Sequence, residues 1–283
     1  MRVHLCGVRG STPAPGAEFV RYGGHTSCVA LAHDDAARPT LILDTGTGVR
    51  AMTPLLGGAP FAGTILYSHL HWDHFQGLPF SAAANDDATQ AAVVVPEPRD
   101  AANLDVEALL ARAMSPPHFP IRPSELAGSW QFSAIAPGEY QYDGFTVMAR
   151  EIPHRGGRTY GYRISDGHST LAYMPDHCPT SLGPGEDGYG EYHAAAIELA
   201  SGADALIHDA TLMPSELATQ AQYGHAAADY AVALARRAQA RTVVLFHHSP
   251  ERTDDELDAL ADRLPGAVVA AQGSVLELPV PDA

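Results

Sequence analysis

Short apolar segments bounded by glycine, proline and aspartate recur along most of the chain. They are three to six residues long and rich in β-branched residues, which is typical of β-strands. We predict strands at Val3–Val8, Cys28–Ala32, Thr40–Leu43, Thr64–Tyr67, Ala92–Val95, Phe145–Ala149, Tyr160–Ile164, Thr170–Tyr173, Ala205–Ile207, Thr242–Phe246 and Ala267–Val269.

Helical patterns lie between some of these strands. The first half of the chain is strand-rich, and so is the start of the second half, with helices later in each half. This order favours a layered α/β architecture with two sheets inside outer helices over a simple alternation of strands and helices. Helices are predicted at Val49–Leu56, Ala101–Met114, His193–Ala200, Ala226–Ala238 and Asp254–Leu264.

The composition is that of a globular chain, with 46% hydrophobic and 18% charged residues. A chain of 283 residues can bury a sizeable core, and no linker divides it, so we predict one domain over residues 1–283. The three cysteines, Cys6, Cys28 and Cys178, form no CxxC pair and follow no apolar leader. They are expected as reduced, buried thiols of a cytoplasmic protein. No segment approaches the roughly 18 apolar residues of a membrane span, so no membrane association is expected.

The chain is strongly acidic. It has 33 Asp and Glu against 17 cationic residues, all of them Arg, for a formal charge of −16. The lack of Lys excludes Schiff-base chemistry, a lysine general base and a GxxxxGK phosphate loop. Because cations drive contact with a nucleic-acid backbone, long nucleic acid is not an expected partner.

The strongest chemical signal is the segment HLHWDH at 69–74, directly after a predicted strand. Residues two apart in an extended segment face the same side, so His69 and His71 can converge on one cation. Asp73 and His74, one turn further on, can serve a second cation. Four potential ligands within six residues favour a metal site over loop histidines that only form hydrogen bonds. Imidazole and carboxylate ligands without thiolate suit zinc first, and also manganese or iron.

HLHWDH resembles the HxHxDH signature of the metallo-β-lactamase fold, and the resemblance extends along nearly the whole chain. GVRGSTP, RYGGHTSC and LILDTGTG, which contains Asp44, are similar to the early strands of the phosphodiesterase branch of this family. EIPHRGG, STLAYMPDH, ALIHDAT, YGHAAADYA and VVLFHHSP follow in the order of that branch. The branch includes ribonuclease Z, the cyclic phosphodiesterase of phosphonate metabolism and cyclic-nucleotide phosphodiesterases. The resemblance implies an α/β, four-layer αββα sandwich.

The resemblance also implies two divalent metal ions and their ligands. In the segment LFHHSP the order of the motif selects His247 rather than His248. His193 and His208, in contrast, have no metal-like spacing and are expected in ordinary hydrogen bonds. The implied ligands are His69, His71 and His154 on one ion, Asp73, His74 and His247 on the other, and Asp176 between them.

The charge of such a centre suits a small anionic substrate. Two divalent ions carry about +4, whereas Asp73, Asp176 and a bridging hydroxide carry about −3. The net charge of about +1 attracts a phosphodiester despite the acidic chain, because remote charges are screened over roughly 8–10 Å. Metal ions lower the pKa of bound water towards about 7 and stabilise both oxygens of an in-line displacement. We therefore expect hydrolysis of small or cyclic nucleotides, with Asp73 both as ligand and as catalytic residue.

Three further residues are candidates for catalysis or substrate binding. The resemblance assigns the role of general acid to His225, which precedes an Ala-rich helical segment, and we expect Asp209 to hold it. A helix-capping histidine is the alternative. Arginines cluster around His154, and Arg155 or Arg158 is predicted to contact the substrate phosphate in a bidentate fork, the alternative being side chains that face solvent.

Several other functions use the same fold. Ribonuclease Z-type cleavage of tRNA is the second hypothesis, but it requires a basic protruding arm, and no Arg-rich Gly-Pro excursion is present. Lactonase, thioesterase or β-lactamase activity would act on a carbonyl. A flavodiiron protein usually has Glu where His71 lies, and a sulfur dioxygenase would need iron. A ligand-binding member without turnover should have lost metal ligands, whereas all seven matched positions are filled.

The resemblance also suggests a homodimer. The apolar residues of Ala51–Leu56 and Phe75–Phe80 fit an interface between two copies, and they fit an ordinary core equally well.

Overall fold

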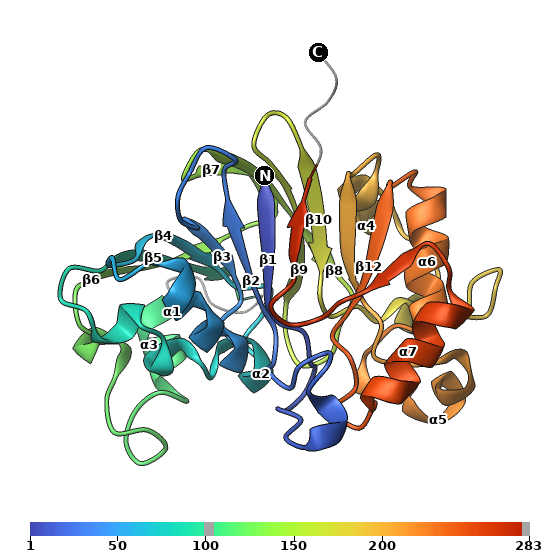
Figure 1. Ribbon diagram of the computed structural model, residues 1–283, viewed down its shortest axis with the longest axis horizontal. Coiled ribbons are helices and arrows are strands. Elements are labelled where there is room, and N and C mark those ends of the chain that lie inside the picture. Colours follow the sequence, from blue (N-terminus) through green and yellow to red (C-terminus); the bar gives the residue numbers. More distant parts are fainter. Residues whose placement is uncertain (99–104, 279–283) are drawn as a thin grey trace.

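The computed structural model describes residues 1–98 and 105–278, and within them fourteen strands form two sheets of seven. The first sheet has the order β14-β1-β2-β3-β4-β5-β6, and the second has the order β13-β12-β11-β10-β9-β8-β7 (Figure 1). The strands of the first sheet are β1 Arg2–Gly7, β2 Cys28–Ala32, β3 Leu41–Leu43, β4 Ala62–Leu66, β5 Gln90–Pro96, β6 Ser129–Ile135 and β14 Val275–Glu277. Those of the second are β7 Gly138–Tyr142, β8 Phe145–Ile152, β9 Thr159–Ser165, β10 Thr170–Met174, β11 Ala205–Asp209, β12 Thr242–Phe246 and β13 Ala267–Val269.

Helices cover the outer face of each sheet. One set, on the first sheet, comprises α1 Met52–Leu55, α2 Trp72–Phe75 and α3 Val106–Ala111. The other set, on the side of the second sheet, comprises α4 Ala194–Ala200, α5 Leu217–Gln220, α6 Ala228–Arg237 and α7 Asp254–Arg263 (Figure 1). No helix within the described ranges is long and apolar enough to cross a membrane.

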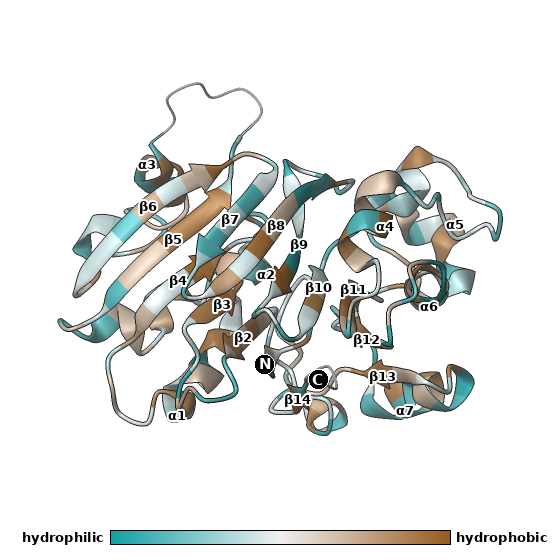
Figure 2. Cartoon of the chain, turned by 90° about the horizontal axis from the view of Figure 1, so that it is seen from above, coloured by the Kyte–Doolittle hydropathy of each residue, from teal (hydrophilic) through white to brown (hydrophobic). Residues whose placement is uncertain are grey.

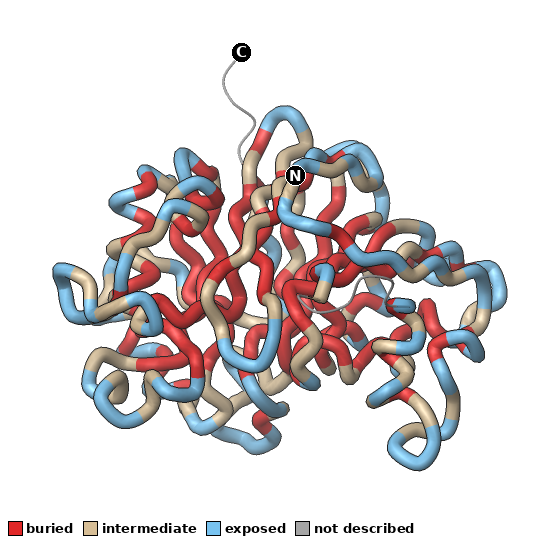
Figure 3. Tube along the Cα trace, turned by 180° about the vertical axis from the view of Figure 1, so that it is seen from behind, coloured by how far each residue is buried: buried red, intermediate tan, exposed pale blue. Residues whose placement is uncertain are grey.

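The alternation of side chains along each strand produces the four layers. In β2, Val29 and Leu31 enter the core between the sheets, whereas Cys28 and Ala30 face the helices outside. Since successive strand residues point to opposite faces, a strand that is apolar throughout requires a cover on both sides. Figure 2 shows brown, hydrophobic segments in the strands of both sheets, and Figure 3 shows buried segments at the centre of the molecule. The predicted αββα sandwich is confirmed.

The directions of the paired strands create an edge of each sheet at which a site can form. Strands β3 to β6 are mutually parallel, and so are β10 to β13. The carboxyl ends of parallel strands meet at one edge of a sheet, and the segments that follow them can therefore converge. The segments after β3, β4, β10 and β12 contain Asp44, His69, Asp176 and His247 in that order.

The predicted strands all occur in the structure, but three strands were missed. Strands β6 and β7 are edge or near-edge strands with many exposed and polar positions, so they lack an apolar run. Strand β14 is a short edge strand, and two of its three residues are exposed. The helix predicted over Ala101–Met114 is shorter, because α3 begins at Val106 after its Asp105 cap, and residues 101–104 lie outside the described ranges. All three cysteines are buried free thiols, as predicted.

Candidate metal centre

The HLHWDH segment leaves β4 and enters the four-residue helix α2. His71 is extended, with φ −70° and ψ 151°, and directly precedes α2. The imidazole rings of His69 and His71 lie 4.3 Å apart between centroids, on the same side of the chain. Asp73 and His74 follow within the helix and face a second group of side chains. His69 and His71 thus lie in one group of side chains, and Asp73 and His74 lie in another.

His154 joins the first pair from the loop after β8. Its Nδ1 donates a hydrogen bond to the carbonyl oxygen of Gly224 at 2.7 Å, so its Nε2 keeps a free lone pair. That Nε2 lies 3.3 Å from Nδ1 of His71 and 3.2 Å from Oδ2 of Asp176. Together with His69, these side chains form a group of ligand atoms that lie within 4.8 Å of one another.

His247 joins the second pair from the end of β12. Its Nε2 lies 3.1 Å from Oδ2 of Asp73 and 3.2 Å from Nε2 of His74. Its Nδ1 lies 3.0 Å from the hydroxyl oxygen of Thr211, which orients the ring. The neighbouring His248 is buried elsewhere and donates from Nε2 to the carbonyl of Ala270 at 2.9 Å. Of the two adjacent histidines, only His247 reaches the cluster.

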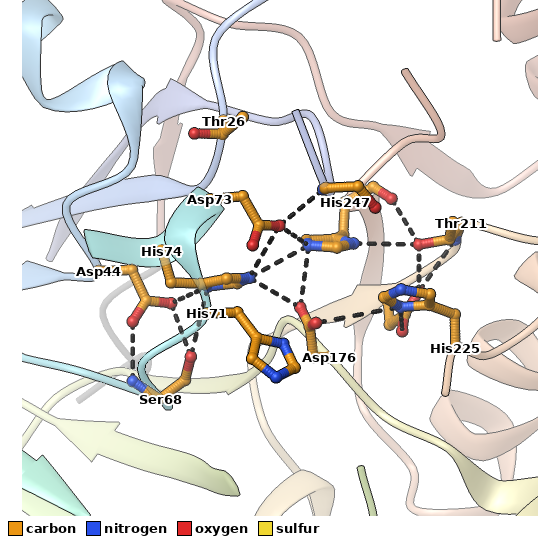
Figure 4. Close-up of polar contacts among 12 residues, drawn as sticks. Thr26, Asp44, Ser68, His71, Asp73, His74, Asp176, Thr211, His225 and His247 are labelled. Carbon is orange, nitrogen blue, oxygen red and sulfur yellow. Dashed lines mark hydrogen bonds and ion pairs between the residues drawn. The ribbon is translucent and has the colours of Figure 1, made fainter. Parts of the chain in front are cut away.

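Asp176 lies between the two groups. Its Oδ2 faces His154 at 3.2 Å and His69 at 3.6 Å, whereas its Oδ1 faces His74 at 3.1 Å and His247 at 3.0 Å. Each carboxylate oxygen therefore points to a different group of histidines, and Figure 4 shows the oxygen that is turned to His74 and His247. This orientation is the one that a carboxylate shared by two cations requires.

The ligand atoms of the cluster are suited to bind a cation. Nδ1 of His74 is hydrogen-bonded to Oδ2 of Asp44 at 2.9 Å, so Nε2 of the neutral ring presents a lone pair. This lone pair meets acceptor atoms of Asp73, Asp176 and His247, all within 3.4 Å. Nε2 of His69 is buried without a hydrogen-bond partner among the described residues. Converging acceptors with no donor between them require a positive charge, and nitrogen and carboxylate oxygen are ligands for borderline divalent metal ions.

The electrostatics of the metal-free protein lead to the same conclusion. Burial favours the neutral imidazole of His247, but the carboxylates of Asp176 and Asp73 outweigh it and raise its pKa to about 10. Burial likewise disfavours the charged form of Asp73, yet His74 and His247 hold the pKa of this carboxyl well below its usual range. In the metal-free protein, protons on the histidines thus supply the positive charge that a bound cation would otherwise supply.

A second carboxylate, Asp44, holds His74 from behind. Asp44 is fully buried and accepts hydrogen bonds from the amide and hydroxyl of Ser68, at 2.7 and 2.8 Å, and from the hydroxyl of Tyr173 at 2.8 Å. Tyr173 belongs to β10 of the other sheet, so this bond joins the two sheets beneath the site. The resemblance points to Asp44, whereas the sequence around Tyr173 indicates only a strand.

Asp209, at the end of β11, connects His225 to the cluster. Its Oδ2 lies 3.0 Å from Nδ1 of His225, and its Oδ1 accepts from the amide and hydroxyl of Thr211 at 2.9 and 2.8 Å. Burial opposes protonation of His225, but Asp209 and Asp176 overcome it and raise the pKa of this imidazole. His225 lies 4.0 Å from Asp176 and lines the site cavity. The contact expected between His225 and Asp209 is therefore present.

The GVRGSTP segment supports the cluster through its backbone. The amide of Ser11 donates to Oδ2 of Asp73 at 2.6 Å. A Cβ atom on Gly10 would lie 2.2 Å from Nδ1 of His247, so only glycine fits there. The buried Arg9 donates to the carbonyls of Ser249 and Arg252 at 3.1 and 2.6 Å and fixes the rim of the cavity. This segment carries part of the resemblance, but nothing in the sequence points to a role for Arg9.

Three other histidines, two of them fully buried, form a hydrogen-bonded chain behind Asp209. Nδ1 of His177 is 2.9 Å from Nε2 of His208, and Nε2 of His177 is 2.8 Å from Nε2 of His193. Nδ1 of His208 donates to the carbonyl oxygen of Asp209 at 2.7 Å. Burial lowers the pKa of His193 to about 4. These rings are neutral near pH 7, and the expectation of ordinary hydrogen bonds for His193 and His208 is confirmed.

The cluster opens into a cavity of about 570 Å³. Its lining includes His71, Asp73, His154, Asp176 and His225. Neither of the arginines predicted to bind substrate lines it. The exposed Arg155 donates to the carbonyl of Gln222, beside the rim. Arg158 lies 3.0 Å from a carboxylate oxygen of Glu151 and 3.8 Å from one of Glu97.

An αββα sandwich with a histidine and aspartate cluster at the edge of its sheets defines a class, the metallo-β-lactamase fold hydrolases. The chain belongs to this superfamily, because the family model for the beta-lactamase superfamily domain matches residues 40–248, most of its length. A curated relative, ribonuclease Z of Natronomonas pharaonis, is 24% identical over 328 aligned positions that cover 100% of this chain and 99% of the relative.

Solved structures agree on the fold. Human tRNase Z, short form, superposes with a TM-score of 0.67 at 19% identity, covering 99% of this chain and 100% of that one. A diphosphatase of the PhnP family gives 0.67 at 17% identity, with coverage of 99% and 98%. Zinc-bound PqqB of Methylobacterium extorquens gives 0.66 at 18% identity, with coverage of 98% and 100%. These similarities extend over the full described architecture, including both sheets.

Proposed function

We propose that this protein is a dinuclear metallohydrolase that cleaves small phosphodiesters, with cyclic or short nucleotides as the substrate class and zinc as the first candidate metal. The observation that carries the proposal is the orientation of Asp176, whose two oxygens face two separate groups of histidines. His69, His71 and His154 would hold one ion, and Asp73, His74 and His247 the other. The zinc-bound structure among the neighbours supports the choice of metal.

The chain's own residues supply the remaining chemistry. When bound, two divalent ions activate water and neutralise charge on the phosphodiester. His225 lies at the cavity wall with Nδ1 turned to Asp209, which leaves Nε2 to give a proton to the leaving oxygen. Asp209 acts as a positioning residue, because it fixes the tautomer and raises the pKa of His225. Contacts of Arg155 and Arg158 with substrate stay predictions.

Small substrates are favoured over long nucleic acid. The formal charge of −16 disfavours a broad contact with a phosphate backbone. The alignment with the archaeal ribonuclease Z is 328 positions long and this chain has 283 residues, so about 45 positions have no counterpart here. The shorter length of this chain agrees with the lack of a basic arm in its sequence.

A second candidate function is endonucleolytic processing of tRNA. The curated relatives that span the whole chain, from Natronomonas pharaonis and Halobacterium salinarum, are both ribonuclease Z, at 24% and 26% identity. Hydrolysis of lactones or thioesters by the same centre is a further alternative from the sequence. The homodimer stays a prediction of the resemblance, and the cytoplasmic location stays a prediction from the cysteines.

Metal analysis and a substrate panel test the proposal. The purified protein should hold two metal ions per chain and hydrolyse bis(p-nitrophenyl) phosphate and at least one 2′,3′- or 3′,5′-cyclic nucleotide. His154→Ala and His247→Ala should each remove one ion. Turnover of pre-tRNA or lactones in the same panel, without turnover of the diesters, would contradict the proposal, as would a protein that binds no divalent metal.

A further inference from the structure

A large exposed aromatic side chain lies inside the metal-binding segment itself. Trp72 is the first residue of α2, directly between His71 and Asp73, and its exposed fraction is 73%. Its indole nitrogen forms no hydrogen bond within residues 1–98 and 105–278. A single exposed apolar side chain is common on protein surfaces, but one that borders the cavity of a candidate metal site offers a ring face to a ligand there.

Trp72 lines two cavities at once. One is the metal-site cavity, and the other is a groove of about 510 Å³ over α2 and the segment after α3. The two helices lie on the same side of the first sheet (Figure 1). Because Trp72 borders both cavities, a molecule whose phosphodiester lies at the histidine cluster lies beside the indole, and the groove is the adjoining space.

The groove is aromatic and carries a cation. Phe75, Phe80 and Phe119 line it, and the rings of Phe80 and Phe119 meet edge to face with centroids 5.7 Å apart. Phe80 is 62% exposed, so its ring is available to a ligand. Arg112 also lines the groove and forms no ion pair within the described ranges, although the chain is strongly acidic.

We propose that Trp72 is a stacking platform for a planar ring of the substrate, and that the groove receives this ring. The inference rests on the proposed phosphodiesterase function and specifies its substrates as diesters of an aromatic alcohol or a nucleoside. An indole beside phenyl rings can stack on the flat face of a nucleobase, whichever base it is. The guanidinium of Arg112 donates to the polar edge of the ring. The volume lies in the range of about 300–1,000 Å³ that is usual for small-ligand sites.

A pair of esters with the same leaving group isolates this contact. We compare thymidine 5′-(p-nitrophenyl phosphate) with methyl p-nitrophenyl phosphate, on metal-loaded wild-type protein, Trp72→Ala, Trp72→Phe and Trp130→Phe. Trp72→Ala should lower the preference in kcat/KM for the thymidine ester by about 10- to 100-fold, mainly through KM. Trp72→Phe should restore most of it. Trp130→Phe, which changes the other tryptophan on β6, is the matched control and should keep the wild-type preference.

Fluorescence gives a readout that does not depend on turnover. In the Trp130→Phe variant Trp72 is the sole tryptophan, and thymidine 5′-monophosphate should quench it saturably whereas ribose 5-phosphate at equal concentration should not. Equal loss on both esters, with lowered metal content, would show that Trp72 only supports the ligand segment and would overturn the inference. A Trp72→Ala protein that changes from dimer to monomer would assign the groove to a second copy and also overturn it. If wild-type protein hydrolyses neither ester, the proposed function fails, and the quenching experiment alone decides on the ring site.

Discussion

Two buried tyrosines next to each other provide a sensitive test of how the site is supported. Tyr173 of β10 is paired with Tyr162 of β9, and both side chains are fully buried between the sheets. The hydroxyl of Tyr173 donates to the carboxylate of Asp44 at 2.8 Å, and that of Tyr162 donates to the backbone carbonyl of Tyr67 at 2.6 Å. Replacement by Phe removes the same atom at both positions, and only the acceptor differs.

The acceptors set different magnitudes. A hydrogen bond to a charged group contributes about 1.5–3 kcal/mol, whereas one between neutral groups contributes about 1 kcal/mol. Asp44 keeps its bonds from Ser68 and His74, so its charge remains partly compensated. We therefore expect Tyr173→Phe to lower the free energy of unfolding by about 2 kcal/mol and Tyr162→Phe by about 1 kcal/mol. Only Tyr173→Phe should also weaken metal binding, by about 10- to 100-fold, because Asp44 orients a ligand.

Urea unfolding of the metal-free variants measures the first effect, and competition with a chromophoric chelator for zinc measures the second. The reasoning requires the two variants to separate in metal affinity. It would be refuted by equal metal affinity in Tyr173→Phe and Tyr162→Phe, since the bond to Asp44 would then do nothing for the ligand His74. Equal loss of stability in both would show that the charge of Asp44 does not strengthen its bond.

Four further outcomes follow from the structure. His225→Ala should slow hydrolysis of diesters with poor alkoxide leaving groups by about 10²- to 10⁴-fold but should affect p-nitrophenyl esters little. If steady-state assays show that both kinds of ester are slowed equally, His225 does not act as the acid. Burial lowers the pKa of His193 to about 4, so the unfolded chain binds a proton more readily than the folded protein does. The free energy of unfolding should therefore fall as the pH drops from 6.5 to 4. His193→Gln should flatten the dependence of the urea midpoint on pH in this range. Gly10→Ala should displace the ring of His247 and lower metal content, whereas Gly157→Ala, whose Cβ would meet nothing within 4 Å, should not; equal metal content in both would count against the close contact. Chelation should lower the melting temperature, because a ligand present at 1,000 times its Kd stabilises the folded state by about 4 kcal/mol; an unchanged melting curve would mean that no metal is bound.

Sequence alone determined the features that local patterns express. The apolar runs indicated strands, and the order of strands and helices favoured two enclosed sheets, because burial on both faces selects apolar residues at consecutive positions. The spacing of His69, His71, Asp73 and His74 indicated a metal site, since all four lie on one short segment whose local geometry is predictable. His154, Asp176 and His247 came from the resemblance, because nothing in their immediate surroundings reveals what they face.

Tertiary structure decided which distant groups meet. Tyr173 contacts Asp44, 129 positions away, through the packing of one sheet on the other, and an apolar strand carries no local sign of such an acceptor. The edge strands β6 and β7 escaped prediction because exposure removes the apolar pattern on which prediction depends. From the sequence Trp72 could equally have been a core residue. Only the tertiary structure shows that it is exposed and that it lines a groove between α2 and the segment after α3. Local sequence reports how a residue is covered, whereas strand register and layer packing determine its partners.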